Sequence, residues 1–216
     1  MGISADFKPY VDQVADTARW ASRKGWAPAT STNYSVRLPK DAAPAVCAIT
    51  ASGIDKDDFD SDSVIVIDGA GRPMNENQLR PSAETPLHLM LYRHKEIGAV
   101  LHTHSIAGAL LSRSAESTGY LRFSGWELLK GLAGITGHNC EVRLPVFPNS
   151  QDMPWLAAHI EPHLQNTDPC YGFLLAGHGL YVWGTTLPDA KRHLEVFEYL
   201  LQCEREVRLY GHIAST

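Results

Sequence analysis

The sequence lacks any long apolar run, and no stretch approaches the about 20 consecutive apolar residues that a membrane-spanning helix needs. Cysteine is scarce: the four cysteines are widely spaced, and no two of them form a Cys-x-x-Cys pair. This spacing favours buried free thiols over a thiolate metal site. The N-terminal residues also lack the basic and apolar regions of a signal peptide. We therefore expect a soluble, cytoplasmic protein that does not associate with a membrane.

Clustered positive charge is missing as well. The 19 lysines and arginines are scattered singly among 24 acidic residues, and the net charge is −5. Proteins that bind nucleic acid or anionic membranes usually carry a basic patch or stripe. The sequence therefore argues against both partners and favours a small-molecule ligand.

The apolar residues that are present suffice for one core. Hydrophobic residues make up 44% of 216 positions, and five are tryptophan, so we expect residues 1–216 to form a single domain. Alternating helical and extended patterns predict an α/β fold with helices covering a central sheet. The predicted helices are 7–24, 85–95, 106–113, 126–132, 153–164 and 188–210. The predicted strands are 34–38, 46–50, 63–67, 140–144, one ending near residue 102 and two around residue 178.

Three histidines follow short apolar runs, where buried strands should meet loops. His102 and His104 lie in AVLHTHS (99–105), and His178 lies in GFLLAGHGLYVWG (172–184). Residues i and i+2 of a strand share a face, about 7 Å apart, so the first two imidazoles could bind one metal ion. A third imidazole would complete a catalytic zinc site with one open position. Ten histidines can produce a His-x-His pair by chance, but polar groups left unpartnered at the end of a core strand favour the metal site.

Five ordered motifs carry a family resemblance over nearly the whole chain. TSTNYSVR (30–37), ITASG (49–53), PSAETPLH (81–88), His-Thr-His and Gly-His-Gly together resemble the class II aldolase family. WELLKG (126–131), PVFPN (145–149) and GHGLYVWG (177–184) are most similar to its methylthioribulose-1-phosphate dehydratase branch. The resemblance implies a mainly antiparallel central sheet flanked by helices. It also implies one zinc ion per subunit on His102, His104 and His178, and a cyclic homotetramer with active sites between subunits.

The resemblance further implies a phosphate cradle made of Thr30, Asn33, Ser52, Gly53 and Ser82. Hydroxyls and backbone N–H groups at such turns can surround a phosphate, although ordinary turn formation would explain the same residues. One position departs from the family pattern. Its first loop commonly has glycine just before the asparagine, and here Thr32 occupies that place. Threonine is a poor substitute if the loop needs a positive φ.

Two carboxylates are candidates for proton transfer. Glu84 opens a predicted helix, where a capping role is the ordinary explanation. Glu127 lies in WELLKG, where a solvated helix residue is the ordinary explanation. In the sugar-phosphate aldolases, the glutamate at the motif position of Glu84 is the acid/base. In the dehydratases, the glutamate at the motif position of Glu127 has that role. The closer resemblance to the dehydratases places Glu127 first and Glu84 second.

The resemblance implies a reaction that can be written atom by atom. 5-Methylthioribulose 1-phosphate would lose water to give 2,3-diketo-5-methylthiopentyl 1-phosphate, a step of methionine salvage. Zinc would polarise the C2 carbonyl, and an acid/base would remove the C3 proton and protonate the departing C4 hydroxyl. The alternatives are an aldolase or epimerase that acts on another sugar phosphate, a non-catalytic, adducin-like scaffolding relative, and a purely structural zinc protein, which would ordinarily have a fourth protein ligand.

Overall fold

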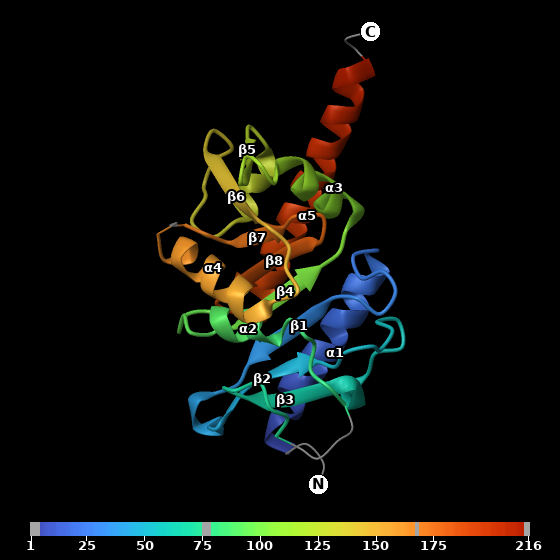
Figure 1. Cartoon of the computed structure of the whole chain (residues 1–216), viewed down its shortest axis with the longest axis vertical. Coiled ribbons are helices and arrows are strands. Elements are labelled where there is room, and N and C mark those ends of the chain that lie inside the picture. The colour runs from blue at the N-terminus through green and yellow to red at the C-terminus, as the bar shows by residue number, and fades with distance from the viewer. Residues whose placement is uncertain (1–4, 75–78, 167–168, 214–216) are drawn as a thin grey trace.

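In the computed structural model, which describes residues 5–74, 79–166 and 169–213, eight strands join in one sheet (Figure 1). Their order is β3-β2-β1-β4-β8-β7-β6-β5, and β6–β7 is the parallel pair among otherwise antiparallel neighbours. The expected mainly antiparallel sheet is therefore confirmed. The strands are β1 Asn33–Arg37, β2 Ala45–Thr50, β3 Val64–Asp68, β4 Ala99–Thr103, β5 Tyr120–Ser124, β6 Glu141–Phe147, β7 Gly172–Leu175 and β8 Gly179–Gly184.

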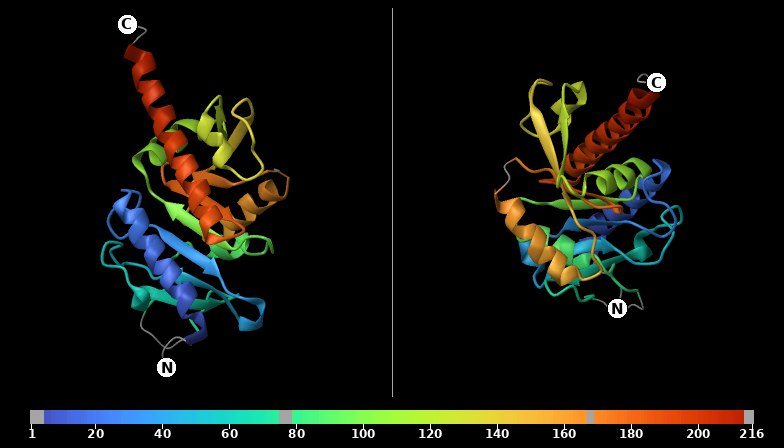
Figure 2. Two further views of the ribbon diagram at one scale, coloured as in Figure 1. Left: turned by 180° about the vertical axis from the view of Figure 1, so that it is seen from behind. Right: turned by 45° about the horizontal axis from the view of Figure 1, so that its top comes forward.

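Helices cover both faces of this sheet, as the sequence pattern predicts. One apolar core joins the sheet to α1, α3 and α5, and a second core joins its other face to α2 and α4. Viewed from behind, α1 and α5 cross the sheet, and the end of α5 projects beyond it (Figure 2). The α-helices are α1 Lys8–Arg23, α2 Thr85–Leu91, α3 Ile106–Ala115, α4 Met153–Asn166 and α5 Leu187–Ile213. Short 3₁₀ turns are η1 Ala5–Phe7, η2 Lys40–Ala42, η3 Ser61–Ser63 and η4 Glu127–Gly131.

The first helix shows how local sequence sets an element. Its buried residues, Val11, Val14, Ala18 and Ala21 among them, recur at helical spacing and form one face. Gly25 follows the helix with a φ of 75°, and the Trp26 amide donates to the carbonyl of Ala21. Glycine adopts this left-handed conformation without steric cost, so the helix ends as the sequence predicts.

Strand alternation decides which face receives the histidines. In β4, Ala99 and Leu101 pack into the core under α1 and α5, whereas Val100 packs into the core under α2 and α4. His102 shares the face of Val100, because side chains two residues apart point the same way. The histidines therefore face the α2 and α4 side of the sheet.

The helix predicted for 85–95 ends earlier than expected, at Leu91. The Arg37 guanidinium, which comes from β1, donates to the carbonyls of Tyr92, His94 and Ile97. These bonds satisfy carbonyls that a longer helix would otherwise have to pair. A contact between residues about 55 positions apart is not visible in the local pattern.

Two further elements differ from expectation. The predicted helix at 126–132 is a short 3₁₀ stretch, η4. Strand β5 was not predicted, although its alternation of exposed and buried residues is the signal of a half-buried strand.

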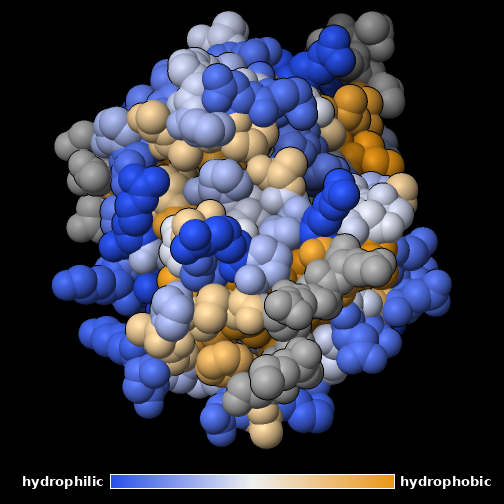
Figure 3. Space-filling model, turned by 60° about the horizontal axis from the view of Figure 1, so that its bottom comes forward, coloured by the Kyte–Doolittle hydropathy of each residue, from blue (hydrophilic) through white to orange (hydrophobic). Residues whose placement is uncertain are grey.

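On the face shown in Figure 3, hydrophilic side chains predominate and apolar ones lie in small groups between them. Among the described residues, no helix is long and apolar enough to cross a membrane.

Candidate metal centre and its surroundings

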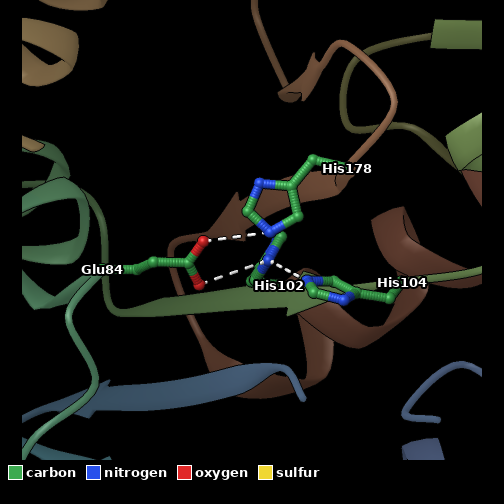
Figure 4. A group of neighbouring side chains, drawn as sticks. All are labelled: Glu84, His102, His104 and His178. Carbon is green, nitrogen blue, oxygen red and sulfur yellow. Dashed lines mark hydrogen bonds and ion pairs between the residues drawn. The ribbon is translucent and has the colours of Figure 1, made fainter. Parts of the chain in front are cut away.

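Four side chains converge on the α2 side of the sheet: Glu84, His102, His104 and His178 (Figure 4). One ligand atom from each lies within 4.8 Å of the others. The His102 and His104 Nε2 atoms are 2.7 Å apart, and the Glu84 carboxylate lies 3.4 Å from His102 Nε2 and 3.1 Å from His178 Nε2. The three histidines that the sequence pointed to are thus gathered, with a carboxylate beside them. Imidazole nitrogen with carboxylate oxygen is a donor set that suits zinc and similar divalent ions.

The end of β4 and the tight turn between β7 and β8 bring these rings together. His102 lies near the end of β4, and His104 directly follows the strand. His178 lies in the turn between β7 and β8, where Gly177 has a φ of 65°. Gly179 passes so close to the rings that a Cβ there would lie 2.9 Å from atoms of both His102 and His104. A side chain at position 179 would therefore displace the ligands.

Hydrogen bonds on the far side of two rings fix which nitrogen faces the cluster. His102 Nδ1 lies 3.1 Å from the Leu180 carbonyl, and His178 Nδ1 lies 3.2 Å from Asn149 Oδ1. Each Nδ1–H donates to that oxygen, so each Nε2 keeps its lone pair toward the cluster. Metal-binding histidines are commonly oriented in this way by an outer hydrogen bond.

Burial keeps the imidazoles of His102 and His104 neutral. It lowers the pKa of His102 well below its usual value, and it lowers the pKa of His104 to about 4 with help from the neighbouring His178. Burial alone would raise the pKa of Glu84, but the positive charge that His102 or His178 carries when it shares a proton with the carboxylate, together with the Asn33 N–H, outweighs burial and holds that pKa below its ordinary range. Neutral imidazoles beside an ionised carboxylate are the protonation states that metal binding requires.

Asn33 links the carboxylate to the sheet. Its register partner across β1 and β4 is His102, and its amide Nδ2 donates to Glu84 at 2.6 Å and to Ser82 Oγ at 3.2 Å. The amide of Asn33, predicted as a phosphate contact, is thus turned toward Glu84 in this structure. Its role toward a phosphate stays a prediction.

The three loops predicted to hold a phosphate meet in space. Asn33 of the first loop contacts Ser82 of the third, and the Ser52 amide of the second donates to the Arg80 carbonyl of the third. Gly53 has a φ of 78°, which favours glycine at this turn. The three loops are thus in contact, and their role in holding a phosphate remains a prediction.

Lys56 joins the first two of these loops and was missed at the sequence level. Its side chain is buried, and its ammonium donates to the Ile54 carbonyl at 2.8 Å and to the Thr30 carbonyl at 3.4 Å. Burial lowers its pKa to about 8, so the ammonium is mostly charged at neutral pH. A buried lysine looks like a solvated charge in sequence, since it stands in the acidic run IDKDD (54–58).

Thr32 has the strained conformation that the family resemblance suggested. Its φ is 73°, a left-handed value that a β-branched residue rarely adopts. Ala29, three residues earlier, has a φ of 55°. The first loop therefore keeps the backbone shape that a glycine would favour while carrying larger side chains.

Glu127 lies apart from the cluster. It is in η4, its side chain is 70% exposed, and it pairs with Lys130 and, at 3.4 Å, with His138 Nδ1. The lysine contact lowers the pKa of this carboxyl. Of the two predicted acid/base residues, only Glu84 is brought to the histidines within a single chain.

Comparison with known proteins agrees with these observations. Residues 12–204 match the family described as class II aldolase and adducin N-terminal domain. The chain is 43% identical over 200 residues to a methylthioribulose-1-phosphate dehydratase of Sorangium cellulosum, covering 92% of each chain. It is 47% identical over 190 residues to the dehydratase of Xanthomonas campestris pv. campestris, covering 88% of this chain and 85% of that one.

Solved structures share the fold at lower identity. An L-fuculose 1-phosphate aldolase superposes with a TM-score of 0.75 at 20% identity, over 98% of this chain and 90% of that one. The L-fuculose-1-phosphate aldolase from Thermus thermophilus gives a TM-score of 0.71 at 22% identity, over 97% of this chain and 99% of that one. The sheet order, the histidine cluster and these matches lead to one conclusion: the chain belongs to the class II aldolase and adducin N-terminal domain family.

Proposed function

We propose that this protein is a zinc-dependent dehydratase that converts 5-methylthioribulose 1-phosphate to 2,3-diketo-5-methylthiopentyl 1-phosphate in methionine salvage. The observation that carries the proposal is the cluster of three imidazoles and one carboxylate in a chain more than 40% identical to dehydratases of that name. His102, His104 and His178 would hold the ion. A bound zinc ion would supply a Lewis acid that polarises the substrate carbonyl and acidifies the adjacent C3 proton.

The remaining chemistry requires a proton acceptor and a proton donor. The C3 proton goes to a carboxylate, and the same group can return a proton to the C4 hydroxyl as it leaves as water. We assign this role to Glu127 and a supporting role to Glu84. Glu84 is held ionised beside the histidines by the Asn33 amide, so it is suited to fix a ligand, whereas its lowered pKa makes it a weak proton acceptor.

The three converging loops would hold the phosphate. Ser52 and Ser82 offer hydroxyls there, and the Lys56 ammonium lies beneath the first two loops as a buried positive charge. A dianionic phosphate placed above it would offset the unfavourable burial of that charge. This arrangement favours a phosphorylated substrate over a neutral sugar.

A tetramer would explain the position of Glu127. This carboxylate lies away from the histidines of its own chain. It can act only if Glu127 of one subunit reaches the histidine cluster of an adjacent subunit. The exposed apolar side chains on the projecting half of α5, Val207, Leu209 and Tyr210, are compatible with burial between subunits. We propose a homotetramer with active sites between subunits.

A class II aldolase that cleaves another sugar phosphate is the second candidate. The observation that favours it is the position of Glu84, which lies beside the histidines, whereas Glu127 lies apart from them. Both reactions begin with the same polarised carbonyl, but retro-aldol cleavage breaks a C–C bond. The two functions therefore differ in their products.

The decisive experiment is turnover of 5-methylthioribulose 1-phosphate by zinc-loaded protein, followed by mass analysis of the products. Dehydration predicts one diketone phosphate that is lighter than the substrate by one water. Formation of dihydroxyacetone phosphate from this or another ketose phosphate would support the aldolase instead. Absence of turnover on every phosphorylated ketose, with metal bound, would favour a scaffolding role.

A further inference from the structure

A buried chain of hydrogen bonds runs from the interior of the second core to Glu84. Tyr92 OH lies 2.7 Å from Ser35 Oγ, which lies 2.7 Å from His88 Nδ1. On the other side of the ring, His88 Nε2 contacts Asn33 Oδ1, and Asn33 Nδ2 donates to Glu84 Oε2 at 2.6 Å. Ser35 and His88 are fully buried, and Asn33 is 1% exposed. With Tyr92 at 5% exposure, every residue of this hydrogen-bonded series before the carboxylate is buried.

The direction of each bond follows from the groups at its ends. The Asn33 amide nitrogen lies 2.6 Å from Glu84 Oε2 and 3.2 Å from Ser82 Oγ, so the nitrogen faces the carboxylate and donates to it. The amide oxygen then faces His88, and the ring must carry its proton on Nε2. Burial lowers the pKa of His88 to about 4, so the ring is neutral and its Nδ1 is a bare acceptor. Ser35 must donate to that nitrogen, and Tyr92 must donate to Ser35.

We propose that His88 is a positioning residue for the metal centre. Its Nε2–H holds the oxygen of Asn33, and this fixes the amide so that its N–H points to Glu84. The inference concerns the site assigned above and rests on Glu84 acting there beside the histidines. Without the His88 donor, the Asn33 amide can rotate by half a turn and present its oxygen to the carboxylate. Two acceptors 2.6 Å apart repel each other, so Glu84 would move away from the imidazoles.

His193 offers a matched control. It is also a buried histidine, 4% exposed, with hydrogen bonds at both ring nitrogens: Nδ1 donates to the Trp183 carbonyl, and Nε2 accepts from the Ala133 amide. Its two partners are backbone groups outside the hydrogen-bond chain that ends at Glu84. Replacing it measures the stability that the fold loses when a core histidine with hydrogen bonds at both ring nitrogens is removed.

The experiment compares His88→Leu, His88→Gln and His193→Leu. It measures Co²⁺ affinity by competition with a chelator, the visible spectrum of the Co²⁺-loaded protein, the melting temperature, and kcat and KM. We expect both leucine variants to melt at lower temperature. His88→Leu alone should lose affinity for Co²⁺ and kcat by on the order of 10–100-fold, with a changed spectrum and a similar KM. His88→Gln keeps an N–H that can reach Asn33 and should recover most of both losses.

The metal measurements need no substrate, so they test His88 even if the proposed reaction is wrong. If His88→Leu binds Co²⁺ like the wild type and like His193→Leu, with an unchanged spectrum, the positioning role is overturned. If His88→Leu does not fold, the comparison passes to Ser35→Ala. That variant removes the donor that makes Nδ1 an acceptor, and it should produce a smaller loss of the same kind. An unchanged Co²⁺ affinity and spectrum in Ser35→Ala would then overturn the proposal.

Discussion

The surroundings of Glu84 and of Glu127 differ in nearly every physical respect. Glu84 is 13% exposed, receives an amide hydrogen bond and lies within ion-pair distance of two imidazoles. Glu127 is 70% exposed and pairs with Lys130 and His138 on a short 3₁₀ turn. The first carboxylate is fixed by its own chain before any ligand arrives. The second is held by two exposed side chains and lies apart from the histidines, so a single chain brings Glu84 to the histidine cluster and leaves Glu127 outside it.

Replacing the histidines of the cluster should have the largest effect on zinc content and turnover. His102→Ala, His104→Ala and His178→Ala should each lower zinc content below about one ion per chain and abolish turnover, because each removes one of three ligands. Elemental analysis and activity of the purified variants check this. His159→Ala, which alters an exposed histidine stacked on Trp155, should keep both zinc and activity. Full zinc content in all three ligand variants would refute the ligand assignment.

The comparison between the two carboxylates is sharpened by Glu127→Gln and Glu84→Gln. Glutamine keeps the shape but cannot exchange a proton, so Glu127→Gln should retain zinc and lower kcat by roughly 10²–10⁴-fold with a much smaller change in KM. Glu84→Gln should lower kcat less. The reverse ranking would show that the carboxylate beside the histidines is the acid/base.

Mixed oligomers test whether Glu127 acts on a neighbouring copy. Glu127→Gln and His104→Ala subunits should each be inactive alone. If sites lie between subunits, dissociation and reassembly of a mixture should restore measurable activity, since some sites combine intact histidines with an intact Glu127. A mixture as inactive as its components, despite proven subunit exchange, would place both groups in one subunit.

A smaller effect, on phosphate inhibition, is expected from Lys56, the buried lysine that contacts the loops predicted to hold a phosphate. Lys56→Met removes a buried positive charge and should weaken inhibition by inorganic phosphate by about 1.5–3 kcal/mol, the usual contribution of a hydrogen bond to a charged group. Zinc content should not change. Lys40→Met, at an exposed lysine of η2, serves as the control. Equal phosphate inhibition in both variants would separate Lys56 from the ligand. Ser52→Ala and Ser82→Ala should raise KM for the phosphorylated substrate in the same assay.

The last effect is on stability and not on activity, and it concerns a third carboxylate, Glu198, on the opposite face of the sheet. It is 3% exposed and accepts a hydrogen bond from Thr103, and burial raises its pKa to about 7, opposite to the shift of Glu84. The folded state therefore holds this proton up to about pH 7, whereas the unfolded chain releases it near 4.5. Between these values stability falls as the pH rises, by up to about 3 kcal/mol from this group.

Urea unfolding from pH 5 to pH 8 checks this sign. Glu198→Gln is neutral at every pH, so its free energy of unfolding should gain on that of the wild type as the pH rises. Subtracting the two curves removes the contribution of the buried histidines, whose lowered pKa values act in the other direction. A difference that does not change with pH would show that Glu198 is ionised in the folded protein throughout.

The sequence predicted the parts of this molecule that depend on local periodicity or on motif order. Helix α1, most of the sheet and the three histidines follow from apolar spacing and from strand alternation. The early end of α2 and the contacts of His88 and Lys56 depend on partners distant in the chain. A window of neighbouring residues cannot reveal such partners. The exposed position of Glu127 likewise follows from the tertiary arrangement of η4 and not from its motif.

Threonine at position 32 changes the entropy of the loop that bears it. With a φ of 73°, this residue costs the folded chain about 1–2 kcal/mol relative to a favourable backbone conformation. A glycine there would avoid that cost but would leave the loop free to sample many more backbone states. Threonine prefers extended and right-handed backbone states, so its own torsions oppose a φ of 73° and the surrounding contacts must hold it there. The entropy that threonine removes from the unfolded chain is outweighed by strain in the folded one, and the loop keeps this shape at a net cost in stability.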